Sequence, residues 1–463
     1  MNSGSVVILG GGLVGSLLAC VMAKRAAGVT LLEKRLDPRL SFQDHGRSIN
    51  LILTSRGLEA LRILGLDQKA RNLAVPVYGR IMHPREGDLV FQAYGQKGEC
   101  NYSISRRDLN VFLLEEAQRR GVQLCFQQEL CEINLKEKSL QFQKEAPLAK
   151  IAYETLFATD GAGSRIRQAL QQLDPMTYSG STEWLEADYK ELSIRPEKAR
   201  EFSLNHEALN IWARSSHMMM ALANRDGGFT VTIYLPRSGA HWCFDRLKTE
   251  ADVRSLFKEE FPDAPALMPD FAQQFLANPQ GSLGTLRFSK WVYKNELVLL
   301  GDAAHAIVPF FGQGMNLGFE DVTELLKTWS ENGNEVPGSS LGLAWDPEAW
   351  FQSRKPNADA IASMALENWI EMKEKVADSE FLRRKKAENW LEANFPDYFK
   401  SRYGLITYTL IPYALTKRLG LLQDDLWDKI KHLPLEQDRL KAFVSAYHQK
   451  AEEVVGRAGV WFC

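Results

Sequence analysis

Hydrophobic and polar positions along the first part of the chain predict a β-α-β unit. Ser5–Gly10 is a short β-branched run that ends in glycines, Leu13–Ala27 has helical character, and Val29–Leu32 is a second apolar run. Short apolar runs bounded by glycine favour strands, and longer runs with a period of 3.6 residues favour helices. We therefore expect two strands that a helix connects.

Similar segments follow in the next part of the chain. Ile49–Leu53, Gln123–Gln127 and Ala152–Ala158 are predicted strands, whereas Ser55–Leu64 and Arg107–Arg120 are predicted helices. Strands that alternate with helices are typical of a parallel sheet covered by helices. The sequence thus predicts a nucleotide-binding type of α/β domain.

The pattern changes near Tyr178. From Tyr178 to Phe288 the segments are β-rich with alternating polarity, Val298–Gly301 returns as a buried strand, and the chain after Asn332 is helical and charged. We expect an α/β fold in which a β-sheet domain is inserted into a Rossmann-type domain and a helical region follows. The predicted parts are residues 1–75, 100–177 and 289–331 for the nucleotide-binding domain, 76–99 and 178–288 for the substrate domain, and 332–463 for the C-terminal helical region.

A glycine-rich turn joins the first predicted strand to the first predicted helix. Its sequence fits GxGxxG, in which Gly10 permits a tight turn, Gly12 lets the backbone approach a pyrophosphate, and Gly15 allows close packing of helix and strand. Glu33 ends the second strand, where a carboxylate can accept hydrogen bonds from ribose hydroxyls. Together these features indicate a dinucleotide site.

Two later motifs favour FAD over NAD as that dinucleotide. Asp160–Arg167 fits DGxxSxxR after a predicted strand, and Gly301–His305 places Asp302 after another strand. A helix predicted to begin at Gly314 would direct its positive dipole end toward the negative charge of a reduced flavin. There is no second GxGxxG, so we expect NADPH to bind transiently in a cleft rather than on a domain of its own.

Composition narrows the expected partners and compartment. The 463 residues are 45% hydrophobic and 25% charged, and the formal net charge of −2 predicts no attraction to nucleic acid. The six cysteines form no CxxC unit and the eight histidines show no metal-ligand spacing, so we expect a reducing, cytoplasmic setting and no metal. No apolar run reaches the length of about 20 residues that a transmembrane helix needs. A monomer and a homodimer both stay open.

In this order, the three motifs resemble those of the aromatic hydroxylase family of single-component, FAD-dependent monooxygenases. Gly46–Leu51, Tyr189–Leu192, His305–Asn316 and Asn368–Met372 resemble most closely the branch whose members hydroxylate kynurenine, and the resemblance extends from Val6 to about Tyr413. It implies that NADPH reduces FAD and that the reduced flavin holds oxygen as a C4a-hydroperoxide. The ring carbon ortho to the amino group of the substrate would then attack the distal oxygen.

The resemblance also implies the site residues, and it implies no catalytic side chain because the flavin carries the chemistry. Besides the glycines above, the implied FAD contacts are Val14, Glu33, Lys34, Arg35, Leu36, Leu53, Arg106, Leu130, Asp160, Asp302, Met315 and Asn316. The implied substrate contacts are Arg80, Tyr94, Asn368 and Tyr403. An arginine can grip a carboxylate through two parallel hydrogen bonds, and a tyrosine can donate a third. Met220, Leu222, Phe229 and Phe310 are candidates for an apolar wall around the substrate ring.

Two other functions stay open at this point. The enzyme could hydroxylate another amino-aromatic acid, or the chain could be a flavin reductase or a non-oxygenating FAD protein. Three departures from the family pattern bear on the first of these: Asp188 follows Glu186-Ala187 where the family has a His-Gly pair, and Ala213 and Ala223 stand where proline is usual. All three fall in the predicted substrate domain.

Overall fold

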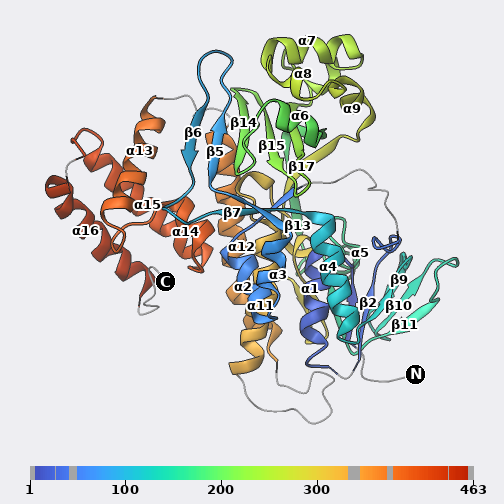
Figure 1. Cartoon of the computed structure of the whole chain (residues 1–463). Coiled ribbons are helices and arrows are strands. Elements are labelled where there is room, and N and C mark those ends of the chain that lie inside the picture. The colour runs from blue at the N-terminus through green and yellow to red at the C-terminus, as the bar shows by residue number, and fades with distance from the viewer. Residues whose placement is uncertain are drawn as a thin grey trace.

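The computed structural model describes residues 6–26, 28–40, 50–331, 345–372, 379–435 and 437–456. A six-stranded sheet with the order β18-β19-β12-β1-β2-β8 lies at the centre of the nucleotide-binding part (Figure 1). Its strands are β1 (Val6–Leu9), β2 (Val29–Leu32), β8 (Gln123–Cys125), β12 (Thr155–Ala158), β18 (Val292–Tyr293) and β19 (Leu297–Leu299). All neighbours pair in parallel except β18 with β19, so the predicted parallel sheet is confirmed.

Helices cover this sheet. Every residue of β1, β2, β12 and β19 is buried, which explains why these strands are continuous apolar runs rather than alternating ones. The covering helices include α1 (Leu13–Met22), α4 (Arg106–Arg119) and α11 (Gly314–Glu331), and α2 (Ser55–Ile63) packs against α11. Helix α1 ends at Met22, before the predicted end at Ala27, which lies outside the described residues.

A second sheet of seven strands has the order β17-β13-β16-β15-β14-β5-β6. Its strands are β5 (Gly79–Met82), β6 (Val90–Ala93), β13 (Gly180–Ile194), β14 (Ala208–Arg214), β15 (His217–Ala223), β16 (Phe229–Pro236) and β17 (Gly281–Phe288). Strand β5 pairs in parallel with β14, so the segment around residue 80 joins strands that come far later in the chain. The domain boundaries themselves stay a prediction.

The β-rich segments predicted between Tyr178 and Phe288 form strands of this sheet, but they are accompanied by helices that were not predicted. The stretch also contains α6 (Pro196–Glu201), η1 (Phe244–Arg246), α7 (Glu250–Glu260), α8 (Ala264–Leu267) and α9 (Phe271–Ala277). Helices α7 to α9 gather beside the second sheet (Figure 1), and their phenylalanines form a separate core with its strands. A capping box of Thr249 and Asp252 starts α7, and this local signal marks the helix in the sequence.

Two small sheets flank the large ones. One has the order β3-β7-β4 and the other β11-β10-β9. Their strands are β3 (Asn50–Leu53), β4 (Ala74–Val77), β7 (Asn101–Ser105), β9 (Leu130–Asn134), β10 (Ser139–Phe142) and β11 (Lys150–Ala152). The short helices α3 (Asp67–Asn72), α5 (Arg165–Leu173) and α10 (Asp302–His305) and the turn η2 (Pro309–Phe311) complete this part.

The C-terminal part is helical, as predicted. It consists of α12 (Pro347–Ile370), α13 (Ser379–Asn394), α14 (Arg402–Tyr408), α15 (Tyr413–Ile430) and α16 (Gln437–Val455). Helices α13 to α16 have a small core of their own, and α12 packs against both α11 and α15. Among the described residues, no helix combines the length and apolar character needed to cross a bilayer. Gly46–Ile49, which carried part of the resemblance, lie outside the described residues.

Candidate active site

The glycine-rich turn leaves no room for side chains at two of its positions. Gly10 has a φ of +110°, and a Cβ atom there would lie 2.3 Å from the carbonyl oxygen of Thr159. A Cβ atom on Gly15 would lie 2.0 Å from the carbonyl oxygen of Gly10. At Gly12, by contrast, a Cβ atom would meet no described atom within 4 Å. The backbone at Gly12 is therefore open to a ligand.

The second and third motifs meet the first one at the same edge of the central sheet. Strand β12 lies between β1 and β19, and the backbone N–H of Leu300 donates to the carbonyl oxygen of Ala158. The Arg167 guanidinium donates to the carbonyl oxygen of Ala303, at 2.8 Å, and to that of Ala162. One arginine of the DGxxSxxR motif thus joins the Asp160 loop to the Asp302 loop.

The residues at this edge fit an extended dinucleotide such as FAD. Glu33 already accepts a hydrogen bond from the Gly11 N–H, at 2.8 Å, and so lies beside the turn. Asp160 is held by the Arg165 N–H, but its Oδ1 atom is buried without a hydrogen-bond partner among the described residues. Burial raises the pKa of the Asp160 carboxyl above its usual value. A buried polar atom without a partner is rare, and a ligand hydroxyl would satisfy it.

A cavity of about 1060 Å³ extends from these loops to the second sheet and the C-terminal helices. The predicted residues that line it are Gly12, Val14, Arg106, Asp302 and Met315 at the nucleotide end and Arg80, Tyr94, Asn368 and Tyr403 at the other end. The predicted residues that do not line it are Gly10, Gly15, Glu33, Lys34, Arg35, Leu36, Leu53, Leu130, Asp160 and Asn316. The structure therefore brings all four predicted substrate contacts to one space.

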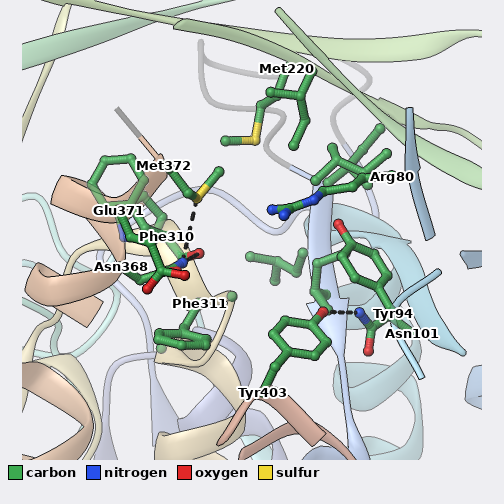
Figure 2. A pocket seen from close by; sticks show the side chains of 18 of the residues that line it. Arg80, Tyr94, Asn101, Met220, Phe310, Phe311, Asn368, Glu371, Met372 and Tyr403 are labelled. Atoms are coloured by element: carbon green, nitrogen blue, oxygen red, sulfur yellow. Dashed lines mark hydrogen bonds between the residues drawn. The ribbon is translucent and has the colours of Figure 1, made fainter. Parts of the chain in front are cut away.

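Three of these four form one wall of the cavity (Figure 2). Arg80, on β5, donates from Nε to Gln92 at 2.8 Å, and the rest of its guanidinium points into the cavity. The rings of Tyr94 and Tyr403 stack with centroids 5.1 Å apart. Burial raises the pKa of Tyr94, and it raises the pKa of Tyr403 to about 12. Both hydroxyls are therefore protonated at neutral pH and can donate hydrogen bonds.

The opposite wall combines aromatic rings with one amide. Asn368, on α12, donates from Nδ2 to the carbonyl oxygen of Phe310 at 2.7 Å. The Phe310 ring stacks on Trp369 at 4.3 Å and lies 5.3 Å from the ring of Tyr234. Asn368 thereby fixes the turn that carries Phe310 and Phe311 (Figure 2). Flat apolar surfaces of this kind suit an aromatic ring.

A third wall comes from alternate residues of β15 and β16. Met220 and Leu222 line the cavity as predicted, but Phe229 does not; it is fully buried in the core between the sheet and α7 to α9. Successive side chains of a strand point to opposite faces, so the residues of β16 that reach the cavity are Thr230, Thr232 and Tyr234. These three residues were not predicted from the sequence, although the period of two in this segment could have revealed them.

The three departures from the family pattern lie away from the cavity wall. Asp188 is buried on β13, where it accepts hydrogen bonds from Arg237 at 2.8 Å and from Gln280 at 2.7 Å. Ala213 lies on β14 and Ala223 on β15. The carboxylate at position 188 therefore supports the sheet rather than facing a substrate.

Asn316 uses its side chain within the protein. Its Oδ1 atom accepts from the Thr54 N–H at 3.0 Å, and its Nδ2 atom donates to the carbonyl oxygens of Ile52 and Gly312 at 2.8 and 2.9 Å. Both amide hydrogens are thus engaged. A contact between Asn316 and FAD would accordingly fall to its backbone, and the side chain holds β3 against the start of α11.

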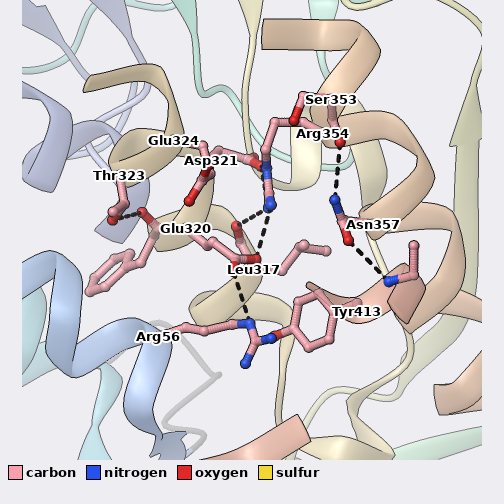
Figure 3. Close-up of polar contacts among 12 residues, drawn as sticks. Arg56, Leu317, Glu320, Asp321, Thr323, Glu324, Ser353, Arg354, Asn357 and Tyr413 are labelled. Carbon is pink, nitrogen blue, oxygen red and sulfur yellow. Dashed lines mark hydrogen bonds and ion pairs between the residues drawn. The ribbon is translucent and has the colours of Figure 1, made fainter. Parts of the chain in front are cut away.

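A buried ionic cluster connects α11 to the C-terminal helices (Figure 3). Arg56, on α2, forms an ion pair with Glu320 at 2.9 Å, and Arg354, on α12, pairs with Glu320 at 3.0 Å and with Asp321 at 3.1 Å. Burial alone would raise the pKa of Asp321, but His305 and Arg354 lower it. This cluster was not predicted from the sequence because its members are far apart along the chain.

Comparison with known proteins decides the family. A family model described as an FAD binding domain matches residues 4–341. A protein named kynurenine 3-monooxygenase from Myxococcus xanthus is 40% identical, over 94% of this chain and 92% of its own. Another protein of that name, from Dictyostelium discoideum, is 38% identical over 92% of each chain. The chain belongs to the kynurenine 3-monooxygenase family.

Membership of the kynurenine 3-monooxygenase family confirms the class predicted from the motifs, an FAD-dependent aromatic monooxygenase. Solved structures agree on the fold. 2-Methyl-3-hydroxypyridine-5-carboxylic acid oxygenase has a TM-score of 0.64 at 16% identity, covering 84% of this chain and 97% of its own. P. aeruginosa PqsL in complex with 2-aminobenzoylacetate has a TM-score of 0.62 at 16% identity, covering 80% and 97%.

Proposed function

We propose that this enzyme hydroxylates L-kynurenine to 3-hydroxykynurenine. In the balanced reaction, kynurenine, NADPH, H⁺ and O₂ give 3-hydroxykynurenine, NADP⁺ and water. The observation that carries the proposal is the continuity of the cavity, which is lined both by the dinucleotide loops and by Arg80, Tyr94 and Tyr403. Kynurenine has an α-amino-acid end, which Arg80 and the two tyrosines can bind, and an aniline ring, which the aromatic and apolar walls can hold.

Arg80 and the tyrosine pair would anchor the carboxylate of the substrate. The part of the Arg80 guanidinium that points into the cavity can form two parallel hydrogen bonds with a carboxylate. The Tyr94 and Tyr403 hydroxyls, both protonated at neutral pH, supply further donors. The glycine turn lines the same cavity as this anchor, so the ring of the substrate would extend toward the flavin.

The glycine turn, Glu33, Arg106, Asp160 and Asp302 would hold FAD, which would supply electron transfer from NADPH and the activation of oxygen. The protein orients the substrate ring and excludes water from it. Phe310, Phe311 and Met220 offer apolar surface for both tasks (Figure 2). An aniline ring is electron-rich, so the reaction needs no side-chain base to activate it.

NADPH consumption by the purified yellow protein, with and without kynurenine, tests the proposal. We expect kynurenine to stimulate consumption and to be converted to 3-hydroxykynurenine in proportion to the NADPH used. If another amino-aromatic acid stimulates NADPH consumption and kynurenine does not, that acid is the substrate instead of kynurenine. No oxygen uptake with any aromatic acid would indicate a flavin reductase or a non-oxygenating flavoprotein. We also propose a cytoplasmic location, on the basis of the cysteine pattern.

A further inference from the structure

Asn101 lies beside the proposed carboxylate anchor, which consists of Arg80, Tyr94 and Tyr403, but is not part of it. It is the first residue of β7, it is only 2% exposed, and it lines the same cavity as Arg80 and Tyr403. Its Nδ2 atom lies 2.8 Å from the Tyr403 hydroxyl oxygen (Figure 2). The sequence separates these two residues by 302 positions, so only the fold brings them together.

The amide of Asn101 donates to Tyr403 rather than accepting from it. In this orientation the Oδ1 atom of Asn101 has no partner among the described residues. The reverse orientation would instead leave a buried NH₂ group without an acceptor. Buried N–H groups without partners are rarer than carbonyl oxygens without partners, so the orientation with Nδ2 toward Tyr403 is the stable one.

This direction decides what the Tyr403 hydroxyl can do. A tyrosine hydroxyl has one hydrogen to donate, and its oxygen can accept. Since the oxygen accepts from Asn101, the hydroxyl hydrogen is free to donate elsewhere. Burial raises the pKa of Tyr403 to about 12, against the opposing effects of hydrogen bonds from Asn101 and Thr407 and of the charge of Arg80, so the hydrogen is present at neutral pH.

We propose that Asn101 is a positioning residue that sets the hydrogen-bond direction of Tyr403, so that Tyr403 donates to the substrate carboxylate. This inference rests on the proposed function, in which Tyr403 contacts that carboxylate. Asn101 itself need not touch the substrate. Its effect therefore depends on the presence of the Tyr403 hydroxyl, and this dependence separates it from a residue that only stabilises the fold.

Asn101→Asp tests the direction with almost no change of shape. A carboxylate can only accept, so the Tyr403 hydroxyl would donate to it and would be lost to the substrate. A hydrogen bond to a charged group has a net value that corresponds to roughly tenfold to 100-fold in affinity. We expect Asn101→Asp to raise the KM for kynurenine by at least about tenfold, with kcat within about twofold of the wild type, because the flavin carries the chemistry.

The same substitution in a Tyr403→Phe background separates two effects on KM: the loss of the Tyr403 hydroxyl as a donor to the substrate, and the added negative charge at position 101. In that background we expect Asn101→Asp to raise KM much less than in the wild type. Asn101→Leu, which adds no charge, should raise KM more weakly and should have no effect on KM once Tyr403 is phenylalanine. If Asn101→Asp impairs folding, Asn101→Leu measured in the wild type and in Tyr403→Phe gives the same comparison. Ser103→Ala is the matched control, since Ser103 is equally buried on β7 but bonds to Ala223, and it should leave KM unchanged.

The outcomes separate the inference from the function on which it rests. An unchanged KM in Tyr403→Phe alone would remove Tyr403 from the substrate site and would overturn both. A raised KM in Tyr403→Phe, with equal effects of the Asn101 substitutions in both backgrounds, would overturn only the role of Asn101. A larger effect in the wild-type background supports the inference.

Discussion

At the scale of single residues, Arg80 is the main source of substrate affinity in the proposed complex. Its remaining donors point into the cavity beside Tyr94 and Tyr403, and Gln92 fixes it at Nε (Figure 2). A carboxylate that leaves water for this site needs a charged partner, because burying an unpaired charge is costly. Arg80 is not among the residues proposed to hold FAD, so a substitution of Arg80 should lower the affinity for kynurenine without lowering the affinity for FAD.

Arg80→Ala should keep FAD and lose affinity for kynurenine. Hydrogen bonds to charged groups contribute about 1.5–3 kcal/mol each, so we expect KM to rise by about 100-fold or more. Arg80→Lys keeps the charge without the planar fork and should recover part of this loss. Steady-state kinetics with the flavin absorbance as a control measures both variants, and an unchanged KM would exclude Arg80 from the site.

Gly12 allows a test of cofactor binding that does not disturb the fold. A Cβ atom at Gly12 would meet no described atom within 4 Å, so Gly12→Ala should leave the melting temperature of the apoprotein unchanged. A pyrophosphate held against this backbone would collide with the new methyl group, and we expect the Kd for FAD to rise by about tenfold or more. Gly28→Ala, also without near neighbours, is the control. Equal FAD affinity in both variants would contradict the proposed phosphate position.

At the scale of elements, Arg56 couples the flavin-binding part to the helices that carry Tyr403. Its guanidinium is fully buried, donates to the carbonyl oxygens of Ile406, Thr409 and Ile411, and lies 3.9 Å from the ring centroid of Tyr413. Those carbonyls belong to the end of α14 and the turn that follows it. The position of Tyr403 on α14 thus depends on an arginine of α2.

Arg56→Met should destabilise the protein and loosen the substrate site together. The three carbonyls would lose their donor and Glu320 one of its two partners, a change that typically costs about 3–5 kcal/mol. We expect a lower midpoint in urea unfolding and a higher KM for kynurenine. Arg62→Ala, on the same helix in an exposed ion pair with Glu59, should change neither quantity. A destabilised variant with normal KM would show that α14 is held by other contacts.

Local signals in the sequence were enough for the central sheet and the dinucleotide loops. Glycines at Gly10 and Gly15 and buried apolar runs report directly on the backbone around them. Contacts between distant segments left no such signal: nothing near Asn101 indicates Tyr403, and nothing near Arg56 indicates Ile411. The four substrate residues were identified only through the family resemblance, because an isolated arginine or tyrosine looks the same at a surface and in a site.

At the scale of the whole molecule, buried charge makes stability depend on pH. His217 is buried on β15 beneath α7, and burial, helped by Arg214 and Arg85, lowers its pKa to about 4. Glu260 lies 3.6 Å away but is already engaged by Arg85 and Arg214, so it does not keep the imidazole charged. The folded protein therefore holds His217 neutral at pH values at which the unfolded chain, with a histidine pKa of about 6.5, binds a proton.

We expect the free energy of unfolding to fall as the pH is lowered from about 6.5 to 4. A single such group contributes up to about 1.4 kcal/mol per pH unit in this window and nothing above it. Urea unfolding of wild type and His217→Gln at pH 7 and pH 5 measures the contribution, and the difference between the two pH values should shrink in the variant. Exposed His432→Gln should leave that difference as it is in the wild type.

The guanidinium of Arg167 donates to two backbone carbonyls, one in the Asp160 loop and one in the Asp302 loop. A genome search keyed to Asp160–Arg167 and Asp302 would consequently retrieve every chain that builds this junction, whatever molecule it oxidises. A search for enzymes that act on one particular aromatic amino acid should instead use the residue types at Arg80, Tyr94, Asn101 and Tyr403. These four positions are too far apart along the chain to form one sequence motif.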